Sequence, residues 1–519
     1  MKKLLMVMMA GLSLAAAAGN LVPEKHRSFT IDCKPGQMSH EYLPSFFPAG
    51  TEGVRVSFEV KLDGVKKGAQ PWFDARVMTK FIDRQYKDKG NGPNIGGWSG
   101  TKDWFPVEKT IKVPAGAPGI ALMPCLFNAS AGKMHVRNLS VEAQQKFTES
   151  AAELKTRLER ERQEKARFVA DEEENRAKWP KTLRVQGNRI VDPSGKEVWL
   201  QGVNAGGMES VPNGDQVVKS VVVAIDEWKA NCIRLPINEA FWGGTGPYQN
   251  DGGVGYRKTV DKIVRLVANR GAYVALDLHR FRAPKDLHAA FWKEIAAKYK
   301  NHPAVIFDLF NEPNGISWEI WRDGGWVGEQ GKHDESAFLS EDEKKKNRGF
   351  ESVGMQALID AVRSTGAKNI VFASGMFWAN DLTGIESEAI EKGEKQSFRL
   401  KDPDGNGIVY EWHTYHWHKG WSRILPVAAK HPIFLGEVGA CPHGIMNFIP
   451  NKDQEDPYTF SPNMIGFIQK HRINWTAWCF HPKAAPCILE NWDYKPTPYW
   501  GEFVKRALAG EKFEFKRMK

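Results

Sequence analysis

The sequence predicts an α/β protein: a (β/α)8 barrel preceded by an all-β sandwich of the jelly-roll type and a helical linker. Three changes of pattern along the chain support this prediction. Short apolar runs separated by Gly, Pro and Asn turns fill the first part. A charge-rich run without Gly or Pro follows, and eight strand-like runs that alternate with helical patterns occupy the remainder. The predicted segments are residues 1–20, 21–144, 145–179 and 180–519.

Composition limits the classes of protein that this chain can belong to. With 519 residues, of which 42% are hydrophobic, it can fill the cores of two or three globular domains. The net charge of +10 comes from 72 basic and 62 acidic residues that are interspersed, and no basic stripe with interleaved aromatics stands out. We therefore expect a mixed solvated surface, no nucleic-acid partner and a monomeric chain.

The first 20 residues have the pattern of a secretory signal peptide. Lys2 and Lys3 precede an apolar run from Leu4 to Leu14, and a run of alanines ends at Gly19. The apolar run is shorter than the roughly 20 residues of a membrane-spanning helix, and no other stretch qualifies. No cysteine closely follows the cleavage region, which disfavours a lipid anchor. The sequence predicts a secreted protein, extracellular or periplasmic, with no membrane span.

Export permits disulfides, and the chain has six cysteines outside this peptide. Cys33 with Cys125, or Cys479 with Cys487, are candidate pairs, but sequence leaves the pairing open. No CxxC or Cys/His spacing predicts a zinc site. The stretch DPDGNG at 402–407 resembles the start of a calcium loop, but its twelfth position is His413 instead of a bidentate Glu. We interpret it as a tight turn and expect no metal.

Residues 21–144 predict a sandwich because apolar residues alternate in five runs, at 54–62, 72–82, 110–116, 119–127 and 133–142. The stretch WSGTKDWFPVEKTIKVP and the later AGKMHVRNLSVE resemble the jelly-roll carbohydrate-binding modules that accompany polysaccharide hydrolases. Trp72, Trp98 and Trp104 could stack on sugar rings, although Trp in so small a sandwich is as often part of the core.

The linker, residues 145–179, is rich in Ala, Leu, Glu, Lys and Arg, with opposite charges three and four residues apart. These features predict a helix of about 50 Å that acts as a spacer. A coiled-coil dimer is the alternative, but the apolar positions do not hold a heptad for three repeats.

Eight strand-like runs follow Trp179, and most are separated by helical patterns such as GYRKTVDKIVRLVANRG. Eight alternating units are the count of a (β/α)8 barrel, whose active site lies at the carboxyl ends of the strands. The runs are VWLQGVN (198–204), NCIRLPI (231–237), AYVALDLH (272–279), AVIFDLFNE (304–312), NIVFASG (369–375), IVYEWHTY (408–415), PIFLGEVG (432–439) and NWTAWCF (474–480).

Two of these runs end in a carboxylate. FDLFNEPNG delivers Glu312 at the end of the fourth strand, and PIFLGEVG delivers Glu437 between glycines at the end of the seventh. Two carboxylates that face each other across a barrel mouth are what glycoside hydrolysis requires: one protonates the leaving oxygen, while the other attacks the anomeric carbon or activates water. The alternative for Glu312 is a helix-capping role, with Pro313 in the first turn.

Polar and aromatic residues at other strand ends fit the same chemistry. Arg234 can pair with a carboxylate and keep it ionised. Five further residues offer donors suited to sugar hydroxyls or a flat face for a sugar ring. A single residue of this kind at a strand end is more often structural, but all five are expected at the same barrel mouth. They are His279, Asn311, His413, Tyr415 and Trp478.

Residues 183–508 resemble glycoside hydrolase family 5, the retaining cellulase and mannanase family. The resemblance rests on LQGVNAGG in the first strand, Asn-Glu-Pro at 311–313, His-Thr-Tyr at 413–415 and Gly-Glu at 436–437. It implies that Glu312 is the general acid/base and Glu437 the nucleophile of a double displacement without a cofactor. It also places Arg234, His279, Asn311, His413, Tyr415 and Trp478 on the family's other active-site positions. Retention predicts carboxyl groups about 5 Å apart, and we expect the negative charge of Glu437 to raise the pKa of Glu312.

The sequence says less about the substrate, which we expect to be a β-linked polysaccharide. Endo-acting cleavage of β-1,4-glucan is the first hypothesis, mannan the next, and xyloglucan and mixed-linkage glucan stay open. The loop from Asn314 to about Arg348 carries Trp318, Trp321 and Trp326, which either line the cleft or pack the loop onto the barrel. Trp417 and Trp421 are expected beside the site. A carbohydrate-binding protein without activity and a transglycosylase are the rival hypotheses.

Overall fold

The structure is a computed structural model that describes residues 19–35, 37–70, 72–149, 153–158, 168–328, 349–386, 389–391 and 394–519. The chain forms two compact units, Met1–Ala166 and Arg167–Lys519. The boundary between them lies inside the predicted linker. The predicted signal peptide lies outside the described residues, apart from its last two positions.

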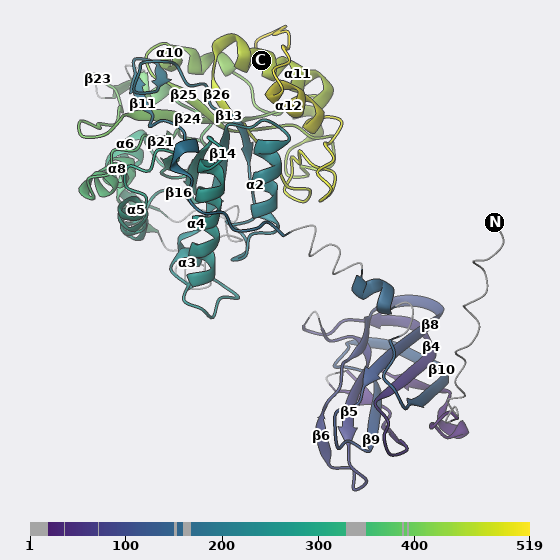
Figure 1. Ribbon diagram of the computed structural model, residues 1–519. Coiled ribbons are helices and arrows are strands. Elements are labelled where there is room, and N and C mark those ends of the chain that lie inside the picture. Colours follow the sequence, from purple (N-terminus) through teal and green to yellow (C-terminus); the bar gives the residue numbers. More distant parts are fainter. Residues whose placement is uncertain are drawn as a thin grey trace, which may run out of the picture. The chain divides into compact units, whose positions relative to one another are not determined.

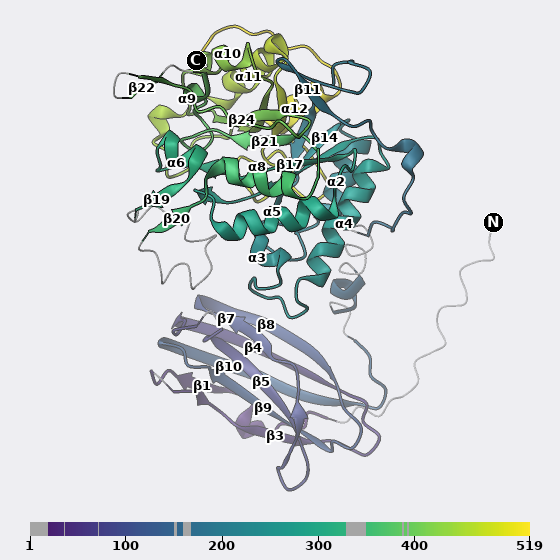
Figure 2. The same cartoon turned by 90° about the vertical axis from the view of Figure 1, so that its left-hand side faces the viewer.

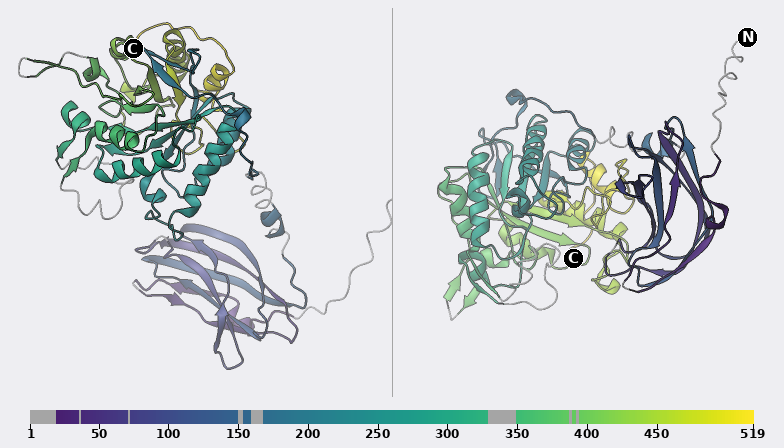
Figure 3. Two further views of the ribbon diagram at one scale, coloured as in Figure 1. Left: turned by 60° about the vertical axis from the view of Figure 1, so that its left-hand side comes forward. Right: turned by 90° about the horizontal axis from the view of Figure 1, so that it is seen from below.

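The first unit is a β-sandwich, so the predicted all-β architecture is confirmed. One antiparallel sheet has the strand order β1-β10-β4-β8, and the other has β2-β9-β5-β6, with β3 paired to β9 and β7 to β5. The right-hand view of Figure 3 shows the sheets as two layers. The strands are β1 (Phe29–Asp32), β2 (Ser39–His40), β3 (Leu43–Phe46), β4 (Gly53–Lys66), β5 (Ala75–Ile82), β6 (Asp88–Asn91), β7 (Ile95–Trp98), β8 (Gly100–Lys112), β9 (Gly119–Leu126) and β10 (Ala131–Gln144), with a short 3-10 helix at Glu24–His26.

Alternation along the strands explains how this sandwich forms. In β4 the residues Val54, Val56, Phe58, Val60 and Leu62 are buried between the sheets, while the residues between them face outward. Because successive side chains of a strand point to opposite faces, this alternation makes one face of each sheet apolar. The two apolar faces pack together.

The three tryptophans singled out in this unit differ in their surroundings. Trp98 packs edge-on against Phe58 and Phe105, so it belongs to the core. Trp104 lies under the guanidinium of Arg137, at 4.1 Å from the ring centre. Trp72 is 55% exposed. Sugar binding by this unit stays a prediction.

The continuous helix predicted for residues 145–179 is wrong for residues 168–175. Residues 153–158 are helical, residues 159–167 lie outside the described part, and residues 168–175 have no regular secondary structure. Contacts with the barrel explain the difference. The Val169 carbonyl accepts a hydrogen bond from Lys262, and Glu172 forms an ion pair of 2.9 Å with Arg270. Tertiary contacts of this kind override helix propensity, which is a weak preference.

The second unit contains a closed barrel of eight parallel strands, and every strand predicted for it is confirmed (Figure 1). Neighbours in the barrel follow the chain order, and the last strand pairs with the first. The strands are β13 (Gln201–Asn204), β14 (Cys232–Ile237), β15 (Tyr273–Leu278), β17 (Val305–Asp308), β21 (Val371–Ser374), β24 (Ile408–Tyr415), β25 (Ile433–Gly439) and β26 (Asn474–Ala477).

Helices connect these strands and cover the outside of the barrel (Figure 2). Their apolar faces and the outward side chains of the strands form the largest core of the molecule. The helices are α2 (Val217–Asp226), α3 (Glu239–Trp242), α4 (Val254–Ala268), α5 (Asp286–Lys298), α6 (Trp318–Asp323), α8 (Gly354–Ser364), α9 (Thr383–Glu386), α10 (Leu425–Ala428), α11 (Pro457–His471) and α12 (Gly501–Leu508). Short 3-10 helices lie at Arg176–Lys178, Trp421–Ile424 and Asn451–Asp453.

Four short pairs of strands lie in the described part of the second unit, outside the barrel. The pair that matters most for the site is β16 (Phe281–Arg282) with β18 (Glu312–Pro313), because it joins the ends of the third and fourth barrel strands. The others are β11 (Arg184–Gln186) with β12 (Arg189–Val191), β19 (Gly325–Val327) with β20 (Phe350–Ser352), and β22 (Ala389–Glu391) with β23 (Glu394–Gln396).

The interior of the barrel changes character along its axis. Side chains at the amino ends of the strands are apolar and form one cluster with Leu183 and Ile190, which come from the β11–β12 hairpin. This cluster contains Leu200, Cys232, Tyr273, Ala275, Ile306, Ile370, Phe372, Val409 and Phe434. Toward the carboxyl ends the interior side chains become charged. The charged side chains inside the barrel thus gather at the carboxyl ends, where the site is expected.

All six cysteines, each in the described part of the chain, are free, so neither candidate disulfide is present. Cys33 lies just after β1 in one sheet of the sandwich, whereas Cys125 lies on β9 in the other. The Cys33 thiol donates to the Ala129 carbonyl instead. No described helix is long and apolar enough to cross a membrane.

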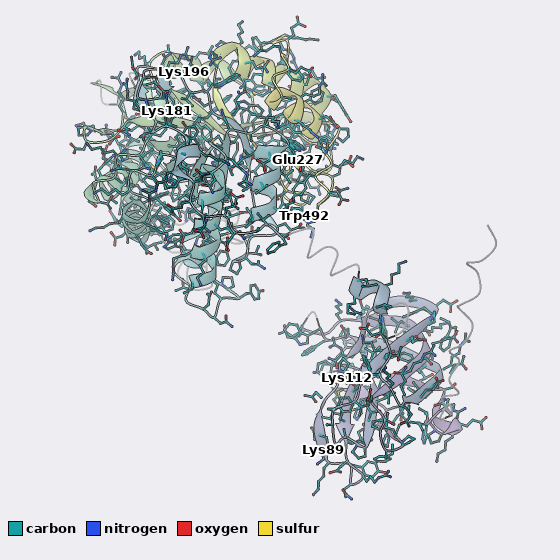
Figure 4. All side chains as sticks on the ribbon, viewed as in Figure 1. Lys89, Lys112, Lys181, Lys196, Glu227 and Trp492 are labelled. Carbon is teal, nitrogen blue, oxygen red and sulfur yellow. The ribbon has the colours of Figure 1, made fainter. Side chains whose placement is uncertain are left out.

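Exposed lysines occur on both units, and the calcium-like stretch forms the turn that the sequence predicts. Lys89 and Lys112 on the sandwich, and Lys181 and Lys196 on the barrel, are exposed (Figure 4). Asp402 of DPDGNG binds Arg363 through both carboxylate oxygens, at 2.6 and 2.9 Å, and also accepts from the Gly407 backbone. Its carboxylate thus stabilises the predicted turn.

Candidate active site

Glu312 lies where the chain leaves the fourth barrel strand. Its backbone pairs with Phe281 in the short β16–β18 ladder, and its amide donates to the Arg280 carbonyl. Its Oε1 lies 2.9 Å from Nδ1 of His413, at hydrogen-bond distance. Glu312 therefore faces the centre of the barrel mouth. The helix-capping alternative is wrong, because Glu312 and Pro313 form the short strand β18.

Glu437 lies on β25, the seventh barrel strand, next to His413 on the sixth. Tyr415 donates to its Oε2 at 2.5 Å, and Arg234 donates to its Oε1 at 2.9 Å. The preceding Gly436 carbonyl accepts from the side chains of Asn204 and Thr476, at 2.8 and 2.6 Å. Donors thus fix both the carboxylate and the backbone that carries it.

The two carboxylates are close to each other. One carboxylate oxygen of Glu312, one of Glu437 and a ring nitrogen of His413 all lie within 4.8 Å of one another. This separation matches the value of about 5 Å that retaining glycosidases need, and it is below the roughly 6.5–9.5 Å of inverting enzymes. The three groups are also near enough to share a cation, but acid/base chemistry requires none.

The site drives the two pKa values apart. Burial raises the pKa of Glu312 to about 7, and the negative charge of Glu437 adds to this effect, whereas the hydrogen bond with His413 opposes it. Neighbouring charge was expected to cause this shift, but burial contributes more. Burial alone would also raise the pKa of Glu437, yet His413, Arg234 and His279 outweigh it and hold that pKa below its usual range. One carboxyl group is thus suited to donate a proton and the other to attack.

Arg234 is fully buried and lies among four carboxylates. Its nitrogens are 3.1 Å from Asp277, 2.7 Å from Asp308, 3.1 Å from Glu411 and 2.9 Å from Glu437. A single buried guanidinium can bind several carboxylates because it carries five donors in fixed directions. Arg234 therefore sets the position of Glu437 relative to the rest of the site.

Sequence reasoning missed Asp277, Asp308 and Glu411. All three are fully buried and come from the third, fourth and sixth barrel strands. A signal for them exists: Asp277 and Glu411 stand two residues before His279 and His413, so alternation places each pair on the same face of its strand. An acidic residue inside an otherwise apolar strand requires a buried partner.

The remaining predicted residues surround this pair. Asn311 Oδ1 accepts from Arg234 at 2.8 Å, which leaves its Nδ2 without a hydrogen-bond partner among the described residues. His279 pairs with Asp277 at 2.7 Å and stacks on the half-buried Trp478, with ring centres 5.5 Å apart. All eight predicted residues thus lie in one cluster or in contact with it.

Among the aromatic residues considered for the cleft, some pack in the core that surrounds the barrel. Trp421 is buried and packs against Phe460 and Phe467, so its expected place beside the site is wrong. Trp321 is buried too, and its Nε1 donates to the Ser374 carbonyl. Trp318 packs on Trp321, so these two hold the loop against the barrel.

Other aromatics remain accessible to solvent. Trp417 is half-buried and stacks on the Tyr415 ring at 4.7 Å, and Trp326 is 63% exposed. Sequence analysis overlooked Phe377 and Trp378, which are exposed just after the fifth strand. The Trp378 amide donates to the Pro313 carbonyl, next to Glu312.

The stretch around Phe377 and Trp378 has an uncommon backbone. Phe377, Trp378 and Ala379 have φ values of 52°, 60° and 55°, in the left-handed region that non-glycine residues rarely adopt. Three such residues in a row are costly, and strain of this kind concentrates at functional sites.

Most of the barrel unit matches a known protein family. The profile of the family described as "Cellulase (glycosyl hydrolase family 5)" matches residues 191–484, which is more than half of the chain. The chain belongs to glycosyl hydrolase family 5. The match contains all eight barrel strands and all eight predicted site residues, and it confirms the resemblance found in the sequence.

Named relatives within glycosyl hydrolase family 5 are distant. Cellulase CelDZ1 of a Thermoanaerobacterium species is 24% identical over 361 residues, which cover 64% of this chain and 81% of that protein. Endoglucanase A of Butyrivibrio fibrisolvens is 25% identical over 50% of this chain, and the chain spans only about half (52%) of its length. Among solved structures, β-glucanase SdGluc5_26A of Saccharophagus degradans, in complex with cellotetraose, shares 22% identity at a TM-score of 0.48, covering 66% of this chain and 97% of that one.

Proposed function

We propose that the protein is an endo-acting, retaining glycoside hydrolase that cleaves β-1,4-linked glucan. The observation that carries this proposal is the pair Glu312 and Glu437, whose carboxylates lie within 4.8 Å of each other while their pKa values are shifted in opposite directions. Membership of a cellulase family and relatives named cellulase and endoglucanase support the choice of glucan.

The first step forms a covalent glycosyl-enzyme. Ionised Glu437 attacks the anomeric carbon, the glycosidic bond breaks, and Glu312 gives its proton to the departing oxygen. Tyr415 and Arg234 hold Glu437 in place for this attack, because each donates a hydrogen bond to a different oxygen of the carboxylate.

The second step releases the sugar. Glu312, now ionised, takes a proton from water, the water oxygen bonds to the anomeric carbon, and Glu437 leaves as a carboxylate. Two inversions at one carbon give net retention of configuration. The same groups serve both steps, so no cofactor enters the scheme.

Substrate contacts follow from the polar and aromatic groups beside the two carboxylates. Asn311 Nδ2 has no partner among the described residues, so it is a donor for a sugar hydroxyl. His279 and Trp478 offer a polar edge and an apolar face beside Glu437. Phe377 and Trp378, with Trp417, extend aromatic surface along the mouth, which suits a chain of several sugar rings.

We infer that the protein acts outside the cytoplasm, because its first 20 residues have the pattern of an export signal. Such a location places the enzyme where polymers too large for uptake are found. Binding of the same polymer by Trp72 or Trp104 on the sandwich is part of this proposal, as is a monomeric chain.

The test is release of reducing ends from carboxymethylcellulose, mixed-linkage glucan, xyloglucan, glucomannan, galactomannan and xylan. The proposal expects the wild type to cut at least the first and Glu437→Gln to cut none. A matched control is Glu294→Gln, since Glu294 lies on α5 and accepts from Trp242 Nε1 away from the site. Cleavage of mannan alone would replace glucan with mannan as substrate, and binding without cleavage by the wild type would contradict hydrolysis.

Product analysis separates the remaining rival. Hydrolysis shortens cello-oligosaccharides, whereas a transglycosylase passes the sugar from Glu437 to another sugar and makes longer chains. NMR of the fresh product should show the β-anomer first; an α-anomer would contradict retention.

A further inference from the structure

His413 connects Glu312 to a second carboxylate that lies deeper in the barrel. Its Nδ1 is 2.9 Å from Oε1 of Glu312, and its Nε2 is 3.0 Å from Oε1 of Glu411. Both His413 and Glu411 are fully buried. The three side chains thus form one line, Glu411–His413–Glu312, that runs from the barrel interior to the reacting atoms.

The strand next to β24 leaves room for these three side chains. Glu411, His413 and Tyr415 alternate along β24 and all face the barrel interior. On the adjacent strand, Gly436 has no side chain: a Cβ there would lie 1.6 Å from Oε1 of Glu411 and 2.9 Å from Nε2 of His413. Any other residue at position 436 would displace Glu411. The side chain of Glu411 therefore requires a glycine directly before Glu437.

The ring of His413 faces carboxylates on both sides. Besides Glu312 and Glu411, Glu437 is also near, with 3.8 Å between its Oε2 and Nδ1 of His413. When Glu312 is ionised, a neutral imidazole would point its bare nitrogen at a carboxylate oxygen about 3 Å away, the distance of a hydrogen bond. Two protons on the ring satisfy all of these contacts, because both nitrogens then donate.

Burial raises the pKa of Glu411 to about 7, and groups from four other barrel strands act on its carboxylate. Arg234 lies 3.1 Å from Oε1, and Ser374 Oγ donates to Oε2 at 2.9 Å. Asp308 and Asp277 also face it, as neighbouring acids. Burial raises the pKa of Asp308 well above its usual range, although Arg234 Nε donates to its Oδ2 at 2.7 Å.

We propose that Glu411 is a positioning residue that keeps His413 doubly protonated, so that the imidazolium stabilises whichever of Glu437 and Glu312 carries the negative charge. This inference rests on the proposed function for its role in turnover. Before the first step the charge is on Glu437. When the glycosyl bond to Glu437 forms and Glu312 gives up its proton, the charge moves to Glu312, and Nδ1–H faces both.

The arrangement explains how one site serves two steps. The net charge of the cluster does not change when Glu437 becomes an ester and Glu312 becomes a carboxylate, since one negative charge replaces the other. In a buried cluster, any uncompensated charge would be costly. Glu411 behind the imidazole corresponds to the carboxylate of a Ser–His–Asp triad, which holds the ring and stabilises its cation.

The first test is Glu411→Gln, which keeps the shape but removes the charge. Without it, His413 is charged less of the time, so both Glu312 and Glu437 lose a cationic neighbour and their pKa values rise. We expect both limbs of the bell-shaped pH profile of kcat/KM to move to higher pH, with kcat on cellulose falling by about 10- to 100-fold, the scale of one hydrogen bond to a charged group. Glu411→Asp, which restores the charge, should move the limbs back.

Leaving-group chemistry gives a second readout. A dinitrophenyl cello-oligosaccharide releases a phenolate that needs no proton from Glu312. The burst of phenolate from Glu411→Gln should therefore fall much less than its cleavage of cellulose. Equal falls on both substrates, or pH limbs that coincide with those of the wild type, would show that Glu411 only fills space and would overturn the proposal.

A measurement without turnover guards against a variant that does not fold. In the wild-type protein labelled with 15N-histidine, the signals of His413, assigned by their loss in His413→Gln, should be those of a ring with two N–H groups near neutral pH. A ring with one bare nitrogen would overturn the proposal. This result does not depend on the substrate, so it stays informative even if the protein cleaves no glucan.

Discussion

Tyr415→Phe is the substitution whose effect can be worked out most directly from the structure. It deletes one hydroxyl, which donates to Oε2 of Glu437 at 2.5 Å. The ring itself should stay in place, because it is buried and stacked on Trp417 at 4.7 Å with an angle of 6° between the ring planes. The change therefore removes a hydrogen bond and little else.

The size of the effect follows from the charge on the acceptor. A hydrogen bond to an ionised group contributes about 1.5–3 kcal/mol. It stabilises only the charged form of Glu437, and one pKa unit corresponds to about 1.36 kcal/mol, so the pKa of Glu437 should rise by about 1–2 units. The folded-state pKa of Glu437 is depressed, so losing this donor makes the nucleophile protonate at higher pH.

The assay is kcat/KM on a soluble cello-oligosaccharide as a function of pH. The acid limb of Tyr415→Phe should move up by about 1–2 pH units. At pH values well below the limb, kcat/KM should fall by about 10- to 100-fold, and at the optimum pH it should change less. Tyr248→Phe is the control, since Tyr248 is 96% exposed. An acid limb that coincides with the wild type, at any overall rate, would refute the role given to this hydrogen bond.

Three further predictions concern the acid/base and the loop core. The alkaline limb of wild-type kcat/KM should lie near pH 7, because Glu312 must be protonated to act as acid and burial raises its pKa to about 7; a limb above pH 9 would contradict this. Glu312→Ala should lose cellulose cleavage but keep the phenolate burst on dinitrophenyl substrates, and azide should rescue its turnover with a β-glycosyl azide as product; loss of the burst as well would argue against Glu312 as the acid. Trp321→Ala should lower the free energy of unfolding of the barrel by about 3–5 kcal/mol, since it empties a buried site, whereas Trp326→Ala, at an exposed site, should change it little; equal effects in a urea titration would show that Trp321 is not a core residue.

The barrel and the two carboxylates could be read from the sequence because their signals are local. A buried strand of a parallel barrel is a continuous apolar run, so eight runs with helices between them specify the fold. A carboxylate at the end of such a run, as in FDLFNE and IFLGE, has no place in an apolar core, which identifies Glu312 and Glu437 as residues of the mouth.

Only the tertiary structure decided which groups these carboxylates meet. Arg234 and Glu411 are 177 residues apart in sequence, yet their side chains lie 3.1 Å apart because parallel strands bring equivalent positions to one layer. The same packing buries Trp421, which the sequence placed beside the site, and holds residues 168–175 in a non-helical path through contacts with Lys262 and Arg270. Helix propensity and apolar runs are properties of a segment, whereas burial, charge pairing and pKa values depend on neighbours that the chain brings together only when it folds.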